Sequence, residues 1–219
     1  MERLQFTYSY EFEKNPHPGL FVVLEGLDGS GKETQTNNLI NYLKTAKGTV
    51  VVMREPTNGP FGAPIRHALG RGLQVDNRTL QMGFSTDRSD DLANGRIITA
   101  LVNGETVVSE RYLFSTLAYG YGCGLDVDWL QALQSKFILP DLTFFLDVPP
   151  EICIERITKN RFNFELYEDR LLLEKVYEGY KLLMKRFPGA IIRVDGTKSE
   201  GEITEEIFSI VTSSHKFAV

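Results

Sequence analysis

The sequence predicts an α/β fold in which a five-stranded parallel sheet carries helices on both faces. Short apolar runs, rich in β-branched and aromatic residues, recur at wide spacing along the 219 residues, at 20–24, 50–53, 106–108, 142–146 and 190–194. Runs of this kind are typical of strands that are buried on both faces. Because segments with helical spacing separate them, we expect parallel strands joined by right-handed crossovers.

Two of the intervening segments show the helical period clearly. Within residues 32–46, Leu39, Ile40 and Leu43 fall on one face. From residue 168 onward, apolar residues recur every three or four positions, at Leu172, Val176, Tyr180, Leu183 and Phe187. No internal repeat or long linker interrupts the pattern, so residues 19–219 are predicted to form a single domain.

The first 18 residues follow a different pattern. Apolar side chains alternate there with polar ones, at Leu4, Phe6, Tyr8, Tyr10 and Phe12. Period two is typical of a half-buried strand. Two interpretations of this N-terminal extension stay open: a mobile segment with fortuitous alternation, or a packed segment that serves as an added edge strand or a dimer arm.

Composition and charge narrow the classes of function. The chain has 24 Lys and Arg against 29 Asp and Glu, a net charge of −5, whereas nucleic-acid-binding surfaces are usually basic. No apolar run approaches the roughly 20 residues that span a bilayer. The two cysteines have no metal-ligand spacing, and their use suits a reducing compartment. We therefore expect a cytoplasmic protein that binds neither nucleic acid nor membrane.

A glycine-rich segment, GLDGSGK at residues 26–32, follows the first predicted strand and opens the first predicted helix. It fits the pattern GxxxxGK, in which backbone N–H groups cradle phosphate oxygens and the lysine reaches the β- and γ-phosphates. The N-terminus of the helix adds the positive end of its dipole. We predict that ATP binds to Gly26, Leu27, Asp28, Gly29, Ser30, Gly31, Lys32, Glu33 and Thr34.

The position after the lysine departs from this pattern. A Ser or Thr hydroxyl usually binds Mg²⁺ there, but this chain has Glu33, and Thr34 follows one residue late. One residue on a helix is a rotation of about 100°, so Thr34 should not substitute directly. Three interpretations of Glu33 stay open. It binds the metal through water, it points away while other acidic residues bind the metal, or its presence indicates impaired catalysis.

Further motifs follow in order along the chain. They are REPT at 54–57, GPFGAPIRHAL at 59–69, LQMGFSTDR at 80–88, SERY at 109–112 with AY at 118–119, and FLDVPPEICIERI at 145–157. Together with GLDGSGK they resemble the thymidylate kinase family of P-loop nucleoside monophosphate kinases, over residues 20–211. The resemblance implies a three-layer P-loop NTPase fold, a homodimer, and phosphorylation of dTMP to dTDP by ATP with Mg²⁺, a step of dTTP biosynthesis.

The resemblance also assigns roles to residues. The catalytic group would be Lys32, Arg111 and, from a lid around 157–168, Arg161. Arg156 would lie against the adenine of ATP, and Glu110 would stand near Mg²⁺. Phe84 would stack on thymine and Arg88 would bond its edge, whereas Arg66 would hold the acceptor's phosphate and Tyr119 would crowd the sugar. The full acceptor set is Asp28, Arg54, Glu55, Arg66, Phe84, Arg88, Arg111 and Tyr119.

Two departures from the family pattern keep alternatives open. Glu110 replaces an aspartate, and Gly120 stands where many members carry a glutamine that helps to read thymine. Gly120 leaves open a kinase for another deoxynucleoside monophosphate. Glu33 leaves open a degenerate, nucleotide-binding regulator. Plain hydrolysis of nucleoside triphosphates fits less well, because the chain carries the acceptor residues Arg66, Phe84 and Arg88 together.

Overall fold

A computed structural model describes residues 11–94, 96–160 and 169–217 of the chain. In chain order its elements are β1 (Phe21–Gly26), α1 (Lys32–Lys47), β2 (Val50–Arg54), α2 (Gly62–Leu69), α3 (Asn77–Ala93), α4 (Ile97–Val102), β3 (Thr106–Glu110), α5 (Leu113–Gly122), α6 (Val127–Gln134), β4 (Leu142–Asp147), α7 (Pro150–Asn160), α8 (Arg170–Arg186), β5 (Ile192–Asp195) and α9 (Glu200–Thr212).

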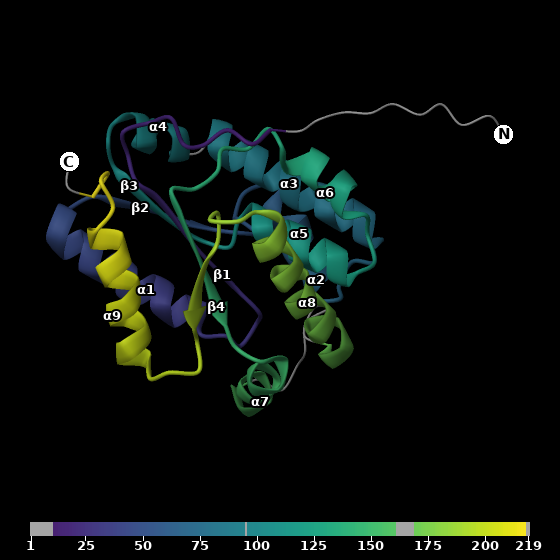
Figure 1. Cartoon of the computed structure of the whole chain (residues 1–219). Coiled ribbons are helices and arrows are strands. Elements are labelled where there is room, and N and C mark those ends of the chain that lie inside the picture. The colour runs from purple at the N-terminus through teal and green to yellow at the C-terminus, as the bar shows by residue number, and fades with distance from the viewer. Residues whose placement is uncertain (1–10, 95, 161–168, 218–219) are drawn as a thin grey trace.

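The strands form one parallel sheet in the order β2-β3-β1-β4-β5 (Figure 1). The prediction of five parallel strands is confirmed for the described residues. The first and last residues of each strand differ from the expected ones by at most two positions. The central strand β1 pairs with β3 on one side and β4 on the other. Because all strands run the same way, their carboxyl ends meet at one edge, where α/β sheets bind ligands.

Helices cover both faces of the sheet, as predicted. Helices α1 and α9 lie on one face, and α2 to α6 with α8 lie on the other (Figure 1). Side chains of β1 alternate between the two layers: Val22 and Leu24 pack toward α1 and α9, whereas Phe21 and Val23 pack toward the opposite helices. All four are buried, and each fully buried side chain of this size contributes about 1.5–3 kcal/mol.

The described part of the N-terminal extension is held against the domain. The backbone of Lys14 forms a single parallel bridge with Leu139, and the Phe12 ring meets Phe187 edge to face at 5.6 Å. The Asn15 side chain donates to Asp141 at 2.7 Å. Residues 12–15 therefore contact the domain, whereas most of the alternating segment, residues 1–10, lies outside the described residues.

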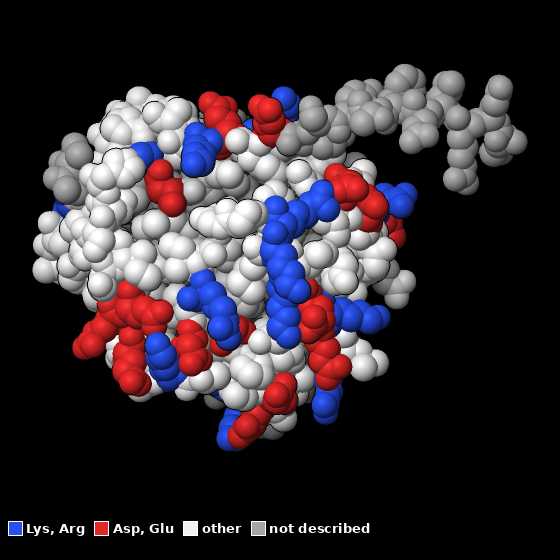
Figure 2. Space-filling view, viewed as in Figure 1, with Lys and Arg blue, Asp and Glu red and all other residues white. Residues whose placement is uncertain are grey.

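The surface mixes charges of both signs. On the face in view, a column of basic side chains lies over α8, and acidic side chains flank it (Figure 2). No helix of the described residues has the length and the apolar character that a membrane span requires.

Helices α5 and α8 approach closely because small residues meet where they pack. A Cβ built on Gly179 of α8 would lie 2.9 Å from the carbonyl oxygen of Ala118 and 3.1 Å from the Tyr121 ring. No side chain larger than the hydrogen atom of glycine fits at this point unless the backbone shifts. The contact matters for the site because α5 carries Ser115 and Tyr119.

We expect Gly179→Ala to lower the free energy of unfolding by about 1–3 kcal/mol, since it overpacks the contact between α5 and α8. The matched control is Gly201→Ala in α9, where an added Cβ meets nothing within 4 Å. That change should raise stability by up to about 1 kcal/mol through helix propensity. Urea denaturation measures both variants, and equal effects at the two positions would contradict the close contact.

Candidate active site

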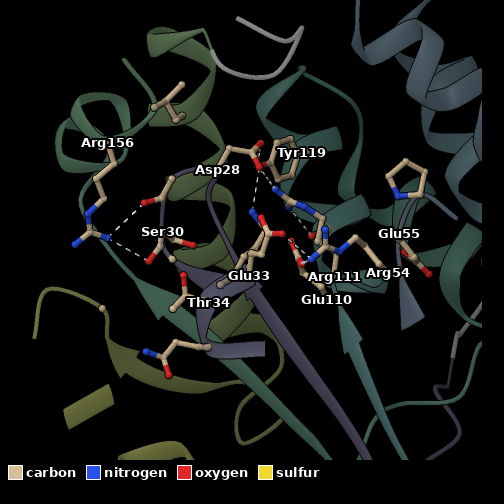
Figure 3. A pocket seen from close by; sticks show the side chains of 18 of the residues that line it. Asp28, Ser30, Glu33, Thr34, Arg54, Glu55, Glu110, Arg111, Tyr119 and Arg156 are labelled. Atoms are coloured by element: carbon tan, nitrogen blue, oxygen red, sulfur yellow. Dashed lines mark hydrogen bonds and ion pairs between the residues drawn. The ribbon is translucent and has the colours of Figure 1, made fainter. Parts of the chain in front are cut away.

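A cleft of about 790 Å³ opens at the carboxyl ends of the central strands (Figure 3). Most of the residues that the sequence predicts for the site line it, namely Asp28, Gly29, Ser30, Gly31, Lys32, Glu33, Thr34, Arg54, Glu55, Arg66, Phe84, Glu110, Arg111, Tyr119 and Arg156. Four do not. Gly26 and Leu27 lie beneath the loop, Arg88 lies behind the cleft wall, and Arg161 falls outside the described residues.

The loop between β1 and α1 depends on glycine at two points. Gly29 has φ +81°, and a Cβ there would lie 2.4 Å from the carbonyl oxygen of Cys153 in α7. Gly31 has φ +89° and precedes the first residue of α1. Both values lie in the left-handed region that side chains rarely adopt. The loop therefore packs against α7 and turns directly into the helix.

Two cations share one carboxylate at the floor of the cleft. The Lys32 Nζ lies 3.0 Å from Asp28 Oδ1, and the Arg111 Nη2 lies 2.5 Å from the same oxygen. The hydroxyl of Tyr119 donates to the second oxygen at 3.0 Å. Burial alone would raise the pKa of Asp28, but Arg111 and Lys32 outweigh it and hold that pKa well below its usual range. Asp28 is thus an anion that gathers the two predicted catalytic cations.

Arg111 adopts a backbone conformation that is uncommon for a residue other than glycine, with φ +67°. Its backbone N–H donates to the carbonyl of Leu24 in β1 at 2.9 Å. Its guanidinium also contacts the Ser115 hydroxyl at 3.1 Å and the Tyr119 hydroxyl at 3.0 Å. The turn between β3 and α5 therefore aims this side chain into the cleft.

A buried carboxylate that the sequence reasoning missed fixes this turn. Glu25 of β1 is fully buried, and its Oε1 accepts from the backbone N–H groups of Tyr112 and Ser115 at 3.0 and 3.1 Å. Its Oε2 accepts from the Ser115 hydroxyl at 2.5 Å and the Tyr180 hydroxyl at 2.9 Å. Burial raises the pKa of Glu25, and these hydrogen bonds oppose the rise. The sequence offered one signal for Glu25, a charged residue directly after the apolar run of a buried strand.

Glu33, the departure in the phosphate loop, pairs with an arginine. The Arg54 Nη2 lies 3.1 Å from Glu33 Oε1 and 2.6 Å from Glu110 Oε2, and Figure 3 shows the three side chains converging. Magnesium usually binds to one or two carboxylates together with substrate phosphates. Two carboxylates drawn to a single cation beside the loop fit that donor set. No group of three or more His, Cys, Asp and Glu suited to a metal occurs among the described residues.

The end of the cleft beyond Arg111 is lined from α2, α3 and α5. Arg66 donates to the carbonyls of Pro56 and Thr57, and Phe84 lies half-buried in the wall. Gln81 and Thr116, which the sequence reasoning did not assign to the site, line the same wall. The signal for Gln81 was its place three residues before Phe84, on the same face of α3.

Arg88 lies beside the cleft and is not part of its lining. Its side chain is fully buried, and its guanidinium binds both oxygens of Glu55, the Gln134 side chain and the Thr116 hydroxyl at 3.1 Å. These contacts hold the guanidinium directly behind Glu55 and Thr116, which line the cleft, and its contact with a base edge stays a prediction. A buried guanidinium must satisfy its donors, and it finds acceptors in Glu55 just after β2 and in residues of α5 and α6.

Position 120 also differs from its expected role. A Cβ on Gly120 would lie 2.6 Å from Leu130 Cδ1 of α6, and Gly120 does not line the cleft. A side chain here would point into the packing between α5 and α6. In this structure the glycine therefore leaves no gap in the wall where a base would bind.

The opposite end of the cleft is lined from α7 and from the segment between β5 and α9. The Arg156 Nη1 lies 3.3 Å from the carbonyl of Ser30, and Figure 3 places Arg156 at the far side of the loop from Glu55. Further residues at this end are Gln35, Ile157, Gly196, Lys198, Glu200 and Ile203. The cleft thus extends on both sides of the phosphate loop.

A phosphate loop at the end of a central parallel strand, with arginines gathered on its two sides, is the arrangement of a P-loop nucleotide kinase. The family model of thymidylate kinases matches residues 24–207. A thymidylate kinase of Leptospira borgpetersenii is 34% identical, covering 87% of this chain and 92% of its own length. One of Leptospira interrogans is 33% identical, covering 93% and 98%. The chain belongs to the thymidylate kinase family.

We expect Arg88→Met to destabilise the protein by about 3–5 kcal/mol at neutral pH, because it leaves the Glu55 carboxylate buried and unpaired. Burial already raises the pKa of Glu55 to about 7 against the opposing effect of Arg88. Without Arg88 the folded state binds the proton more tightly than the unfolded state does. The free energy of unfolding of the variant should therefore fall as the pH rises from about 5 to about 8.

Urea denaturation at these two pH values measures the effect. The control is the double variant Glu55→Gln/Arg88→Met, which removes the titrating group and should lose the added pH dependence. If the free energy of unfolding of Arg88→Met changed with pH just as that of the unaltered protein does, the protonation of Glu55 would not depend on Arg88.

Proposed function

We propose that the chain transfers the γ-phosphoryl group of ATP to dTMP and forms dTDP. The observation that carries the proposal is the meeting of Lys32 and Arg111 on Asp28, at the point where the two ends of the cleft join. Phosphoryl transfer requires positioning and neutralisation of charge rather than covalent chemistry by the protein. A pair of cations at the middle of the cleft supplies both.

Each cation at the junction has a proposed task. Lys32 neutralises the β- and γ-phosphates of ATP as a point charge, and Arg111 binds the transferring group between donor and acceptor. The acceptor's phosphate already carries an anionic oxygen, so it is its own nucleophile and needs no general base. Arg161 remains the candidate lid residue. The exclusion of water on closure would protect ATP from hydrolysis.

At the acceptor end, Arg66 holds the phosphate and Phe84 stacks on the base. Tyr119, anchored to Asp28 and Arg111, closes the space beside the sugar. Thr116 accepts a hydrogen bond from Arg88, which leaves its own O–H to donate toward the base. Arg88 therefore acts as a positioning residue. The match to the thymidylate kinase family model and the relatives of that name favour dTMP over a different acceptor.

At the donor end, the loop binds the phosphates and Arg156 lies against the adenine. Glu110 and Glu33 would hold Mg²⁺, which supplies positive charge to the phosphate oxygens when it is bound. A homodimer in the cytoplasm, formed by a single domain that begins near residue 19, is proposed on family membership alone.

A coupled assay of ADP release tests the function. With ATP and Mg²⁺ fixed, dTMP, dUMP, dCMP, dGMP and AMP are compared as acceptors. We expect the largest kcat/KM with dTMP. Release that does not depend on any acceptor would indicate hydrolysis, and binding without turnover would indicate a regulator.

Lys32→Ala should lower kcat by at least about 10²-fold, because one preorganised charge at the transferring group is lost. The control is Lys44→Ala, an exposed lysine near the end of the same helix, which should leave kcat unchanged. Circular dichroism verifies that both variants fold. A kcat near normal in Lys32→Ala would remove Lys32 from the catalytic group.

A further inference from the structure

The ion-pair cluster of Glu33, Arg54 and Glu110 joins three elements at the loop. Arg54 ends β2, Glu110 ends β3 and Glu33 lies in the first turn of α1. The register of the sheet fixes part of it, because Arg54 and Glu110 are paired residues of neighbouring strands. The cluster therefore connects the metal side of the loop to the strand that leads into the acceptor end.

Electrostatics explains why an arginine lies at this point. Glu33 and Glu110 converge beside a loop built to receive phosphates, and two anions at such a place repel each other and the ligand. A cation between them removes the repulsion. Arg54 supplies one positive charge, whereas a divalent ion supplies two and binds carboxylate oxygens directly.

Exposure shows which contacts of the cluster can open. The Glu110 side chain is 10% exposed, whereas those of Arg54 and Glu33 are 51% and 61% exposed. An exposed ion pair contributes little to stability, because water screens both charges. Glu110 is thus the fixed member, and little free energy holds Arg54 against Glu33.

We propose that Arg54 is a stand-in cation: it closes the Glu33–Glu110 pair in the nucleotide-free protein and gives way to Mg²⁺ when the metal nucleotide binds. The released guanidinium then binds the acceptor's phosphate next to Arg66. This deepens, and rests on, the proposed kinase function. It also gives Glu33 a use: the carboxylate replaces the missing hydroxyl and couples metal binding to acceptor binding.

The coupling is measured by calorimetric titration of dTMP into the protein with ADP, which has no γ-phosphoryl group to transfer. Mg²⁺ should tighten dTMP binding on the order of tenfold relative to EDTA. In Glu33→Gln and Glu33→Ser, dTMP should bind more tightly in EDTA, and the effect of Mg²⁺ should fall below about threefold. The exposed pair Arg170–Glu174 on α8 supplies the control Glu174→Gln, which should keep the full effect. An unchanged effect in Glu33→Gln overturns the proposal.

A second measurement needs no acceptor and separates this proposal from the proposed function. Electron paramagnetic resonance follows the binding of Mn²⁺ to the ADP complex. Arg54→Ala removes the competing cation and should tighten Mn²⁺ binding about three- to tenfold, whereas the control Arg170→Ala should not change it. If Arg54→Ala binds Mn²⁺ no more tightly than the unaltered protein, the exchange of cations is wrong, whatever the acceptor. If dTMP is not phosphorylated but the Mn²⁺ result is as expected, the kinase assignment fails and the exchange stands.

Discussion

The position of the reactive cations depends on one buried carboxylate, that of Glu25. Its four hydrogen bonds join β1 to the N-terminus of α5 and to Tyr180 of α8. A carboxylate at a helix N-terminus satisfies N–H groups that have no partner within the helix. Because the two N–H groups belong to Tyr112 and Ser115, which closely follow Arg111 in the chain, the same interaction that starts α5 also holds the unusual backbone of Arg111 and turns its side chain toward Asp28.

The charged side chains in and beside the cleft lie in small clusters of opposite sign. Asp28 holds Lys32 and Arg111, Glu55 holds Arg88, and two carboxylates hold Arg54. A phosphate ligand therefore meets cations that are already oriented, so little ordering remains to be done on binding. The net charge of −5 is no obstacle to anionic ligands, because the charges that matter lie a few ångströms from where the phosphates bind.

Much of this structure was predictable from sequence, for physical reasons. Strands that are buried on both faces consist almost entirely of apolar residues, so they are recognisable as apolar runs. The phosphate loop is recognisable because its residues are contiguous in the sequence. The partners of Glu33 and Arg88 could not be predicted, because they come from β2, β3, α5 and α6. The direction of Gly120 depends on where α6 packs. Side-chain contacts across elements are set by tertiary packing, about which a linear pattern carries little information.

The contact between Lys216 and Asn15 has a consequence for the topology of the chain. The Lys216 Nζ donates to the Asn15 carbonyl at 3.1 Å across 201 residues of sequence, and it pairs with Asp141 at 2.7 Å. Lys216, near the end of the described chain, thus lies beside Asn15 and Asp141 just before β1 and β4, at the amino edge of the sheet. The contact therefore joins the segment before β1 to the segment after α9 at a distance from the cleft.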